Sequence, residues 1–346
     1  MVGVMTLAFG AGGSEHREHT EFRTCAAIGE TVDEQQLTRR KTASDRVITV
    51  LGATGQQGGS VATALLEAGW RVRAVVRDPS SSRARRLEAA GIETATGDLG
   101  DPASLRSAFT GAHGVFSVQP SSGQAGSEVT DDDEVAYGIS VADTARDAGV
   151  EHLVYSSAIA AGPTSTGIAH FDTKSRIEEH IEGLDICSTI VRPASFMEIL
   201  LLPGMGLAGG RFSFLMDNEQ PMQFIAVRDI GSIVGQIFST PNEFAHRTLD
   251  IAGDALTGHQ LAQHFSVALG RPIDYQRMNP SVLERDDVLS RLAAAVDDGR
   301  LAGHADLTEL RQRFPFLLRF GDWLASRDAG SIATAGRPVM GDVELR

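Results

Sequence analysis

The chain has 346 residues, of which 42% are hydrophobic, and 45 acidic against 31 basic side chains give it a formal net charge of −14. This length can hold two domains of ordinary size with a substantial core. The acidic balance argues against direct binding of nucleic acid, because that affinity depends on Lys and Arg at phosphates. No stretch approaches the roughly 18 consecutive apolar residues of a membrane span, so we expect a soluble protein with no membrane partner.

The two cysteines and the N-terminal residues indicate the cellular compartment of the protein. Cys25 and Cys187 are the two cysteines, and neither has metal-ligand spacing or enough partners for a disulfide framework. We therefore expect no metal site and a reducing, cytoplasmic setting. The first residues lack the basic region of a secretory signal. Residues 1–45 show no sustained hydrophobic periodicity, so we expect a disordered extension there and begin the fold at residue 46.

A short β-branched run, Val47–Val50, passes into a glycine-rich loop and then into helical spacing. Gly52, Gly55 and Gly58 form the pattern G-x-x-G-x-x-G. The first glycine permits the tight turn, the second lets the backbone approach a pyrophosphate, and the third lets the helix pack close to its strand. A second strand follows at 71–76, so the whole βαβ unit fits within about 30 residues. The pattern indicates a dinucleotide site at a helix N-terminus.

The end of the second strand indicates which dinucleotide is bound. Enzymes that prefer NAD usually place an acid there for the ribose 2′-hydroxyl, whereas an arginine accommodates a 2′-phosphate. Here Arg77 precedes Asp78, within a locally basic stretch of an acidic chain, which suggests a site for a small anion. We predict that Arg77 favours NADP(H) and that NAD(H) is the weaker ligand. Three further arginines are interpreted as the solvated face of the next helix: Arg83, Arg85 and Arg86.

Strands and helices continue to alternate along the first half of the chain. Helices are expected at 80–90, from 101 and at 131–148, and strands at 92–95, 114–118, 151–157 and 185–191. This alternation predicts a Rossmann-type α/β fold, a doubly wound parallel sheet with helices on both faces. Ligands of such sheets bind outside the carboxyl ends of the strands. The residues expected at those ends are Gly52 to Gln57, Arg77, Asp98, Gln119 and Ser156.

The pattern changes after residue 194. A glycine-rich loop at 203–210 and short β-like pieces precede helices at 258–269, 280–295 and 305–325. We expect a dinucleotide-binding domain of residues 46–194, completed by a strand within 246–253 that returns to the sheet. Residues 195–245 and 254–330 would form a smaller, discontinuous lobe, followed by a tail at 331–346.

With these motifs in view, the chain resembles the NmrA-like family of atypical short-chain dehydrogenase/reductases over residues 46 to 325. The most discriminating segments are His170-Phe171-Asp172-Thr173-Lys174 and Arg192-Pro193-Ala194-Ser195-Phe196-Met197-Glu198. Arg77-Asp78-Pro79, Gly97-Asp98 and Tyr155-Ser156-Ser157 also match. The resemblance implies NADP(H) bound on the sheet. It also implies either a redox sensor or transcriptional co-regulator that changes protein partners, or a quinone or alkene-type reductase.

The resemblance further implies which residues hold the cofactor. The pyrophosphate loop would be Gly52, Ala53, Thr54, Gly55, Gln56 and Gln57, closed by Gly58. The 2′-phosphate would lie at Arg77 to Ser81, the adenine side at Asp98 and Leu99, and the nicotinamide ribose at Gln119, Pro120 and Ser121. The nicotinamide end would be lined by Lys174, Ser195, Phe196, Met197 and Glu198.

One departure concerns catalysis. Dehydrogenases of the wider superfamily use Tyr-x-x-x-Lys, in which the tyrosine transfers a proton, and this chain has His170 in place of the tyrosine while keeping Lys174. A histidine with a pKa near ~6.5 can act as an acid, but we favour a packing or capping role for His170. Ser156 is a third candidate to assist catalysis. Nearby apolar residues suit a substrate pocket and a core equally well: Phe171, Phe196, Met197, Leu200 and Leu201.

Two functions therefore remain. In the first, the protein binds NADP(H) and acts as a cofactor-responsive regulator of a protein partner, with little or no dehydrogenase turnover. In the alternative, it is an NADPH-dependent reductase of a small quinone, carbonyl or conjugated compound. Both share the fold, so the fold does not separate them. The missing tyrosine favours the first, and a homodimer is open in either case.

Overall fold

The computed structural model describes residues 45–122, 128–202, 204–327 and 332. The extension expected at 1–45 lies outside the described residues except for Asp45, and the tail expected at 331–346 lies outside them except for Ile332.

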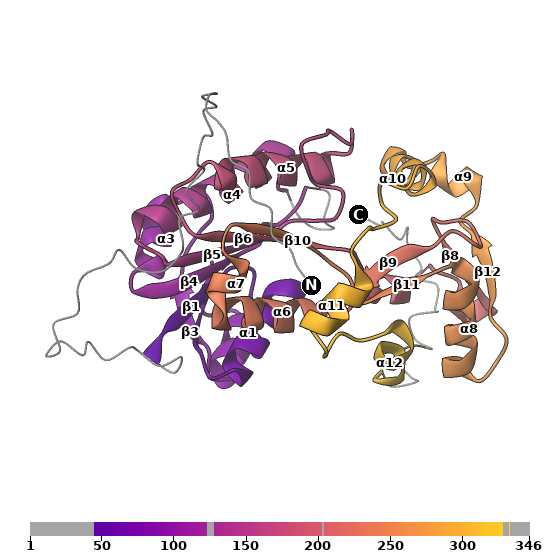
Figure 1. The fold of residues 1–346 in the computed structure, drawn as a ribbon, viewed down its shortest axis with the longest axis horizontal. Helices are drawn as coiled ribbons and strands as arrows, with labels where there is room; N and C mark the ends of the chain where they lie inside the picture. Colours follow the sequence, from indigo (N-terminus) through magenta and orange to yellow (C-terminus); the bar gives the residue numbers. More distant parts are fainter. Residues whose placement is uncertain (1–44, 123–127, 203, 328–331, 333–346) are drawn as a thin grey trace, which may run out of the picture.

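A seven-stranded sheet forms the centre of the first half of the molecule (Figure 1). Its order is β10 (Arg247–Ile251), β6 (Ser188–Pro193), β5 (His152–Ser156), β4 (Ala112–Ser117), β1 (Val47–Val50), β2 (Arg71–Val76) and β3 (Glu93–Thr96). Every neighbouring pair runs parallel. The predicted Rossmann-like α/β class is confirmed. The strand expected to return late in the chain is β10, which pairs with β6.

Helices cover both faces of this sheet (Figure 1). One face carries α1 (Gln56–Glu67), α2 (Ser82–Ala89) and α6 (Val227–Ser239), and the other carries α3 (Pro102–Phe109), α4 (Asp131–Asp147) and α5 (Ala169–Glu182). The central strands β1 and β5 are buried along their whole length, as a strand covered on both faces must be. This burial explains why apolar side chains do not alternate with polar ones along either strand.

Helix α6 was not among the helices predicted from the sequence, although its apolar residues have helical spacing. Ile230, Ile233, Val234 and Ile237 are fully buried. Gly231 lets α6 approach α1 closely, because a Cβ there would lie 2.5 Å from the backbone oxygen of Ser60. Helices α1 and α6 therefore pack together over one face of the main sheet.

The order of the strands reverses at β1. β2 and β3 lie on one side of β1, and β4, β5, β6 and β10 lie on the other. This reversal of strand order is the point at which doubly wound sheets bind their ligands. The glycine loop follows β1 directly, so it lies at this point.

The second half of the molecule lies beside the sheet (Figure 1) and has two small sheets. One comprises β11 (Asp254–Leu256), β9 (Met222–Ile225) and β7 (Ser195–Phe196), and the other β12 (Asp274–Arg277) and β8 (Arg211–Phe214). The helices are α8 (Gly258–Leu269), α9 (Pro280–Leu283), α10 (Asp287–Asp297), α11 (Leu307–Arg313) and α12 (Phe320–Ala325). A short α7 (Pro241–Phe244) precedes β10 and lies at the main sheet, where Phe244 O accepts from Thr189 of β6. The division into domains at the boundaries given above stays a prediction.

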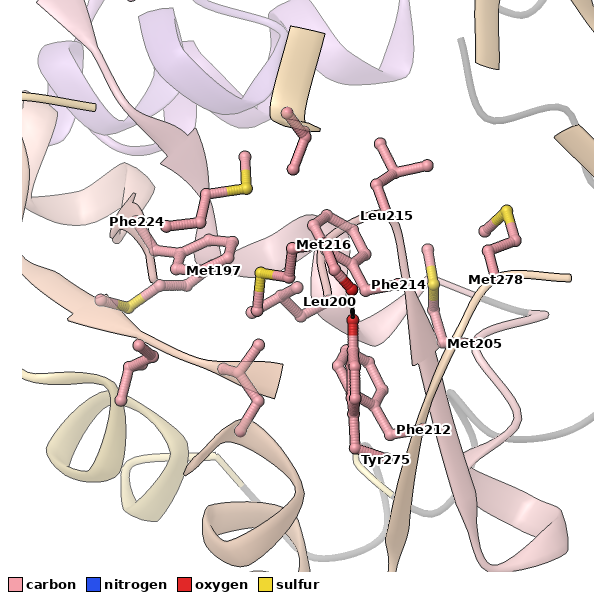
Figure 2. Packing of buried hydrophobic residues seen from close by; sticks show 14 of the residues in the cluster. Met197, Leu200, Met205, Phe212, Phe214, Leu215, Met216, Phe224, Tyr275 and Met278 are labelled. Atoms are coloured by element: carbon pink, nitrogen blue, oxygen red, sulfur yellow. Dashed lines mark hydrogen bonds between the residues drawn. The ribbon is translucent and has the colours of Figure 1, made fainter. Parts of the chain in front are cut away.

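The core of this half is rich in sulfur and aromatic side chains. All five methionines that the structure describes are buried in one cluster: Met197, Met205, Met216, Met222 and Met278. Figure 2 shows four of them packed among Phe212, Phe214 and Phe224, with the hydroxyl of Tyr275 donating to the backbone oxygen of Met216 at 2.5 Å. Flexible thioethers fill irregular space between rings well, so the cluster needs no regular layering.

Two expected helices are each broken in two. The helix expected at 280–295 is α9 and α10, because the carboxylate of Asp286 caps a new helix at Val288 and Leu289. The helix expected at 305–325 is α11 and α12. Pro315 stands between them, and a proline has no N–H to continue a helix.

Candidate functional site

The glycine loop joins β1 to α1 at the carboxyl edge of the sheet. Gly52 has a φ of +66°, a conformation that favours glycine, and its backbone oxygen accepts from Gly55 N at 2.8 Å. A Cβ at Gly58 would lie 2.4 Å from the backbone carbon of Gly52, so only glycine lets α1 start this close to the strand. The fold itself requires the first and third glycines of the motif.

Gly55 differs from the other two. Its backbone is extended, and a Cβ there would lie 3.3 Å from the backbone oxygen of Gly52. The first turn of α1, which starts at Gln56, has no side-chain cap and no acidic residue. Unpaired N–H groups at such a helix end attract an anion. Of the loop residues, Gly52, Thr54, Gly55 and Gln56 are exposed, Gln57 is half-buried, and Ala53 and Gly58 are buried.

The end of β2 presents Arg77 at the surface. Arg77 is exposed and has no hydrogen bond or ion pair with any residue that the structure describes. The carboxylate of Asp78 accepts from Ser80 N at 2.8 Å and Ser80 Oγ at 2.6 Å, which lowers the pKa of Asp78. Ser81 Oγ accepts from Ala84 N and caps α2. Asp78 is therefore engaged in the turn, whereas the guanidinium of Arg77 is available to a ligand.

The basic stretch around Arg77 is divided between two ends of the strand. Arg71 and Arg73 lie at the amino end of β2, where both pair with Glu93 of β3, and Arg73 also donates to Ala108 O and Thr110 O. These two arginines bind groups of the protein, on β3 and at the end of α3. The number of arginines in this stretch is therefore larger than the number available to bind an anion.

The end of β3 presents Asp98 and Leu99. Asp98 is exposed, and its Oδ1 accepts from Gly100 N at 2.8 Å while its own N–H donates to Ser104 Oγ at 3.0 Å. Leu99 is half-buried against the core under α3 and α4. The two residues form a turn that places Asp98 at the carboxyl edge, as expected from its position after β3.

The end of β4 carries an unsatisfied acceptor. Gln119 is 7% exposed, and its Nε2 donates to Ser117 Oγ at 2.8 Å. Its Oε1 is buried and has no hydrogen-bond partner among the described residues. A buried carbonyl without a donor costs free energy, so this atom suits a hydroxyl or amide donor supplied by a ligand. Pro120 beside it is half-buried.

Ser121 and Lys174 meet in a buried polar cluster. The Lys174 ammonium donates to Glu134 Oε1 at 2.7 Å, to Ser121 Oγ at 2.9 Å and to His170 O at 3.0 Å. Ser121 Oγ donates to Glu134 Oε1 at 3.1 Å. The Thr173 hydroxyl has two acceptors for its one hydrogen, Ala169 O at 2.9 Å and Glu134 Oε2 at 3.1 Å. Glu134 is 1% exposed and Lys174 7%. Burial lowers the pKa of Lys174, with the carboxylate of Glu134 acting in the opposite direction.

Glu134 is the residue that sequence reasoning missed. Four acids occupy the first turn of α4, where negative charge is favourable, and Asp133 forms a capping box with Thr130. Glu134 instead turns inward on the buried face of α4, in line with Gly138 and Val141. A carboxylate in register with an apolar stripe was the signal that could have identified it.

His170 and Ser156, the other two catalytic candidates, are placed differently from each other. The residue His170 is exposed overall. Desolvation of its ring by the surrounding protein, and repulsion by the Lys174 ammonium, both lower the pKa of His170. Its ring contacts Phe171 edge to face, with centroids 5.0 Å apart. Ser156 is 2% exposed and donates to Gln57 Oε1 at 2.7 Å. Neither residue contacts the Lys174 ammonium through its side chain.

The family of the chain follows from these motifs and the fold together. The NmrA-like family model matches residues 44–297, which is most of the chain. The chain belongs to the NmrA-like family. An NmrA-like family domain-containing oxidoreductase from Aspergillus hancockii is 31% identical over 258 residues, covering 68% of this chain and 76% of the relative. An NAD(P)H azoreductase from Xenophilus azovorans is 31% identical over 231 residues, covering 66% and 76% respectively.

A solved structure of NmrA, described as a negative transcriptional regulator in complex with NADP, has the same fold. It superposes with a TM-score of 0.66 at 23% identity, covering 81% of this chain and 94% of NmrA. At that identity the similarity concerns the fold. Among the helices that the structure describes, none is long and apolar enough to cross a membrane. Within the same residues no group of three His, Cys, Asp or Glu side chains is arranged to hold a metal.

The Arg-Pro-x-x-Phe-x-Glu segment of this NmrA-like protein contributes mainly to packing. Ser195 and Phe196 form β7 and are half-buried, and Met197 is fully buried in the methionine-rich cluster. Glu198 accepts from Val227 N, Trp323 Nε1 and Arg327 Nη2 at 3.1–3.2 Å. Its carboxylate therefore joins the start of α6 to the end of α12.

The apolar residues that suited either a pocket or a core are largely core. Phe171, Met197 and Leu200 are buried in the methionine-rich cluster, and Leu201 packs against it. Phe196 packs against the cluster on the α1 side of the main sheet. The structure gives each of these side chains a packing role.

Arg192 of the same segment is bound by Glu178 on α5. Its Nε and Nη2 donate to the two carboxylate oxygens of Glu178 at 2.9 and 2.5 Å. Glu178 is 3% exposed and lies one turn after Lys174. Helix α5 therefore buries one member of each of two ion pairs, Lys174–Glu134 and Glu178–Arg192.

Proposed function

We propose that this protein binds NADP(H) at the carboxyl edge of its main sheet and acts as a cofactor-responsive regulator with little or no dehydrogenase turnover. The observation that carries the proposal is the convergence, at the point where strand order reverses, of the glycine loop, the unpaired Arg77 and the unsatisfied Gln119 Oε1. Each of the three lacks a partner that a dinucleotide would supply.

The residues present fit such a cofactor. The loop from Gly52 to Gln57 would hold the pyrophosphate, because the start of α1 offers uncapped N–H groups and Gly55 carries no side chain over them. Arg77 would hold a 2′-phosphate, and Asp98 with Leu99 would flank the adenosine. Gln119 Oε1 would accept from a hydroxyl of the nicotinamide ribose. When bound, the cofactor supplies a hydride or the acceptor for one.

The regulatory role is supported by the lack of a positioned proton donor. His170 has a lowered pKa and is therefore neutral near pH 7, and the N–H groups of Lys174 are all bonded within the protein. Tyr155, the nearest tyrosine in sequence to Ser156, is 1% exposed and burial raises its pKa well above 10. Carbonyl reduction by ordinary dehydrogenase chemistry needs an acid at the reacting oxygen. The NmrA structure of the same fold is described as a transcriptional regulator with NADP.

The second candidate is an NADPH-dependent reductase of a small quinone, carbonyl or conjugated compound. It is supported by the names of the two relatives, an oxidoreductase and an NAD(P)H azoreductase, each 31% identical. A quinone or an azo group can take its proton from water, so such a reaction does not need the missing tyrosine.

Two measurements test the proposal. Calorimetric titration with NADPH and NADH tests binding, and the absence of NADPH binding would overturn it. Steady-state oxidation of NADPH with a panel of quinones, aldehydes and azo compounds separates the two roles. We expect no NADPH oxidation above the decay of the cofactor alone. Sustained turnover with any acceptor would contradict the regulatory role and support the reductase.

A further inference from the structure

Lys174 has no hydrogen-bonding capacity left over. An ammonium carries three N–H groups, and those of Lys174 have three acceptors: Glu134 Oε1, Ser121 Oγ and His170 O. The resemblance to the family implied that Lys174 and Ser121 are both cofactor ligands, but here they are bonded to each other. A ligand that takes an N–H of Lys174 must therefore displace one of these acceptors.

The three acceptors are unequal in how readily they can be displaced. Glu134 is a carboxylate with 1% exposure, and removing its cation would leave a buried charge unpaired. Its other oxygen lies 3.1 Å from the Thr173 hydroxyl, whose single hydrogen is shared with Ala169 O at 2.9 Å. The oxygen of His170 belongs to the backbone of the same helix, one turn before Lys174. Displacing the Glu134 carboxylate would therefore cost most, whereas His170 O and Ser121 Oγ are neutral acceptors.

Of the two neutral acceptors, Ser121 is the one that lies outside α5. Its hydroxyl is neutral, and it donates its own hydrogen to Glu134 Oε1 at 3.1 Å. If Lys174 turned one N–H to another oxygen, Ser121 would keep the bond to Glu134 and lose only an acceptor role. Ser121 also lies two residues after Gln119 in the segment that follows β4. The Oε1 of Gln119 has no hydrogen-bond donor among the described residues. A sugar hydroxyl near these residues could accept from Lys174 and donate to Gln119 at once.

We propose that Glu134 is a positioning residue that anchors the Lys174 ammonium, and that the Ser121 hydroxyl occupies the direction in which Lys174 donates to a ribose hydroxyl of the cofactor. The proposal rests on the proposed NADP(H) function and specifies how the same site is regulated. Ser121 then competes with the cofactor for Lys174. This is the opposite of the ligand role that the sequence implied for it.

The two roles of Ser121 predict effects of opposite sign. Under competition, Ser121→Ala leaves one N–H of Lys174 unpaired in the free protein, and the cofactor restores its partner. We expect NADPH to bind about two- to tenfold more tightly than to the wild type in calorimetric titration. A weaker affinity of the variant would show that Ser121 is a direct ligand and would overturn the competition.

The anchor has a test that does not depend on the cofactor. Glu134→Gln leaves the Lys174 ammonium buried without its counter-charge, which favours the neutral and nucleophilic amine. We expect Lys174 in this variant to react at least about tenfold faster with an acylating reagent, measured by peptide mass spectrometry on the folded protein. We also expect NADPH to bind about tenfold more weakly. Wild-type reactivity in the variant would overturn the anchor.

Glu178→Gln is the matched control. It removes a buried carboxylate from a second ion pair, with Arg192, one turn along the same helix, and should lower the melting temperature comparably. It should change neither the reactivity of Lys174 nor NADPH affinity. Equal effects of both variants would mean general loosening of α5 and would contradict the proposal. If the wild type does not bind NADPH, the proposed function and the competition both fail, whereas Lys174 reactivity still decides the anchor.

Discussion

The hydroxyl of Ser156, at the end of β5, donates to Oε1 of Gln57, in the first turn of α1, over 2.7 Å and 99 residues of sequence. This bond spans β4, which lies between β5 and β1 in the sheet. It ties the helix that follows the glycine loop to the strand whose end faces the expected nicotinamide. Ser156 therefore helps to fix the position of Gln57, at the end of the glycine loop.

The first prediction concerns this bond. Ser156→Ala should lower the free energy of unfolding by about 1 kcal/mol, because a buried neutral hydrogen bond is lost. NADPH affinity should fall severalfold as Gln57 loses its support. Urea denaturation of both single variants and of Ser156→Ala with Gln57→Ala gives the coupling energy, expected to be about 1 kcal/mol. Additive effects of the two substitutions would show that the bond contributes nothing.

The second prediction concerns the choice of cofactor. Arg77→Ala should weaken NADPH binding by about 1.5–3 kcal/mol, roughly one to two decades, and leave NADH binding nearly unchanged, because only NADPH carries the 2′-phosphate. Arg73→Ala is the control, since Arg73 pairs with Glu93 at the amino end of the same strand. Calorimetric titration measures both. Unchanged NADPH affinity in Arg77→Ala would remove the phosphate assignment.

The third prediction separates two glycines three residues apart. Gly55→Ala should lower stability only slightly, because its backbone is extended and its Cβ would lie 3.3 Å from the backbone oxygen of Gly52, but the added methyl group at the anion site should weaken NADPH binding at least about tenfold. Gly58→Ala should instead destabilise the protein by about 1–3 kcal/mol, because its Cβ would overlap the backbone of Gly52. Circular dichroism melting and titration test the pair. The assignment fails if Gly55→Ala binds NADPH as the wild type does.

The fourth prediction concerns Asp229 in the first turn of α6. Its Oδ2 accepts from Leu318 N at 2.8 Å, and its Oδ1 is buried without a hydrogen-bond partner among the described residues. Desolvation raises the pKa of Asp229 to about 6, helped by Glu198 and opposed by the Leu318 N–H and by Arg228. The folded state therefore holds this proton more tightly than the unfolded chain.

Stability from this group is thus complete below about pH 4, the unfolded pKa, and is lost as the pH rises through 6. Asp229→Asn keeps an acceptor for Leu318 N without the charge. We expect it to raise the free energy of unfolding by about 3 kcal/mol at pH 8 and by little at pH 4, measured by urea denaturation. An equal difference at both pH values would contradict the raised pKa.

Local sequence determined the fold class and the position of the cofactor loop. The spacing of Gly52, Gly55 and Gly58 and the alternation of strands and helices depend on neighbouring residues, because turn geometry and hydrophobic periodicity are properties of short segments. Arg77 could be placed at the end of β2 for the same reason. The breaks at Asp286 and Pro315 were also visible locally, as a capping residue and a proline, but the longer apolar pattern concealed them.

Only the tertiary structure decided which polar groups meet. Glu134 and Lys174 are 40 residues apart and Glu198 and Trp323 are 125 apart, and no local pattern connects the members of either pair. The cofactor contact expected for Glu198 stays a prediction, and the structure shows its carboxylate bonded to Val227 N and Trp323 Nε1. A carboxylate can serve as a surface charge, an anchor or a helix cap, and the choice depends on which donors the packing of helices brings within hydrogen-bond distance. That choice is made by the burial of apolar faces across the whole chain, since burying a polar group without a hydrogen-bond partner costs free energy.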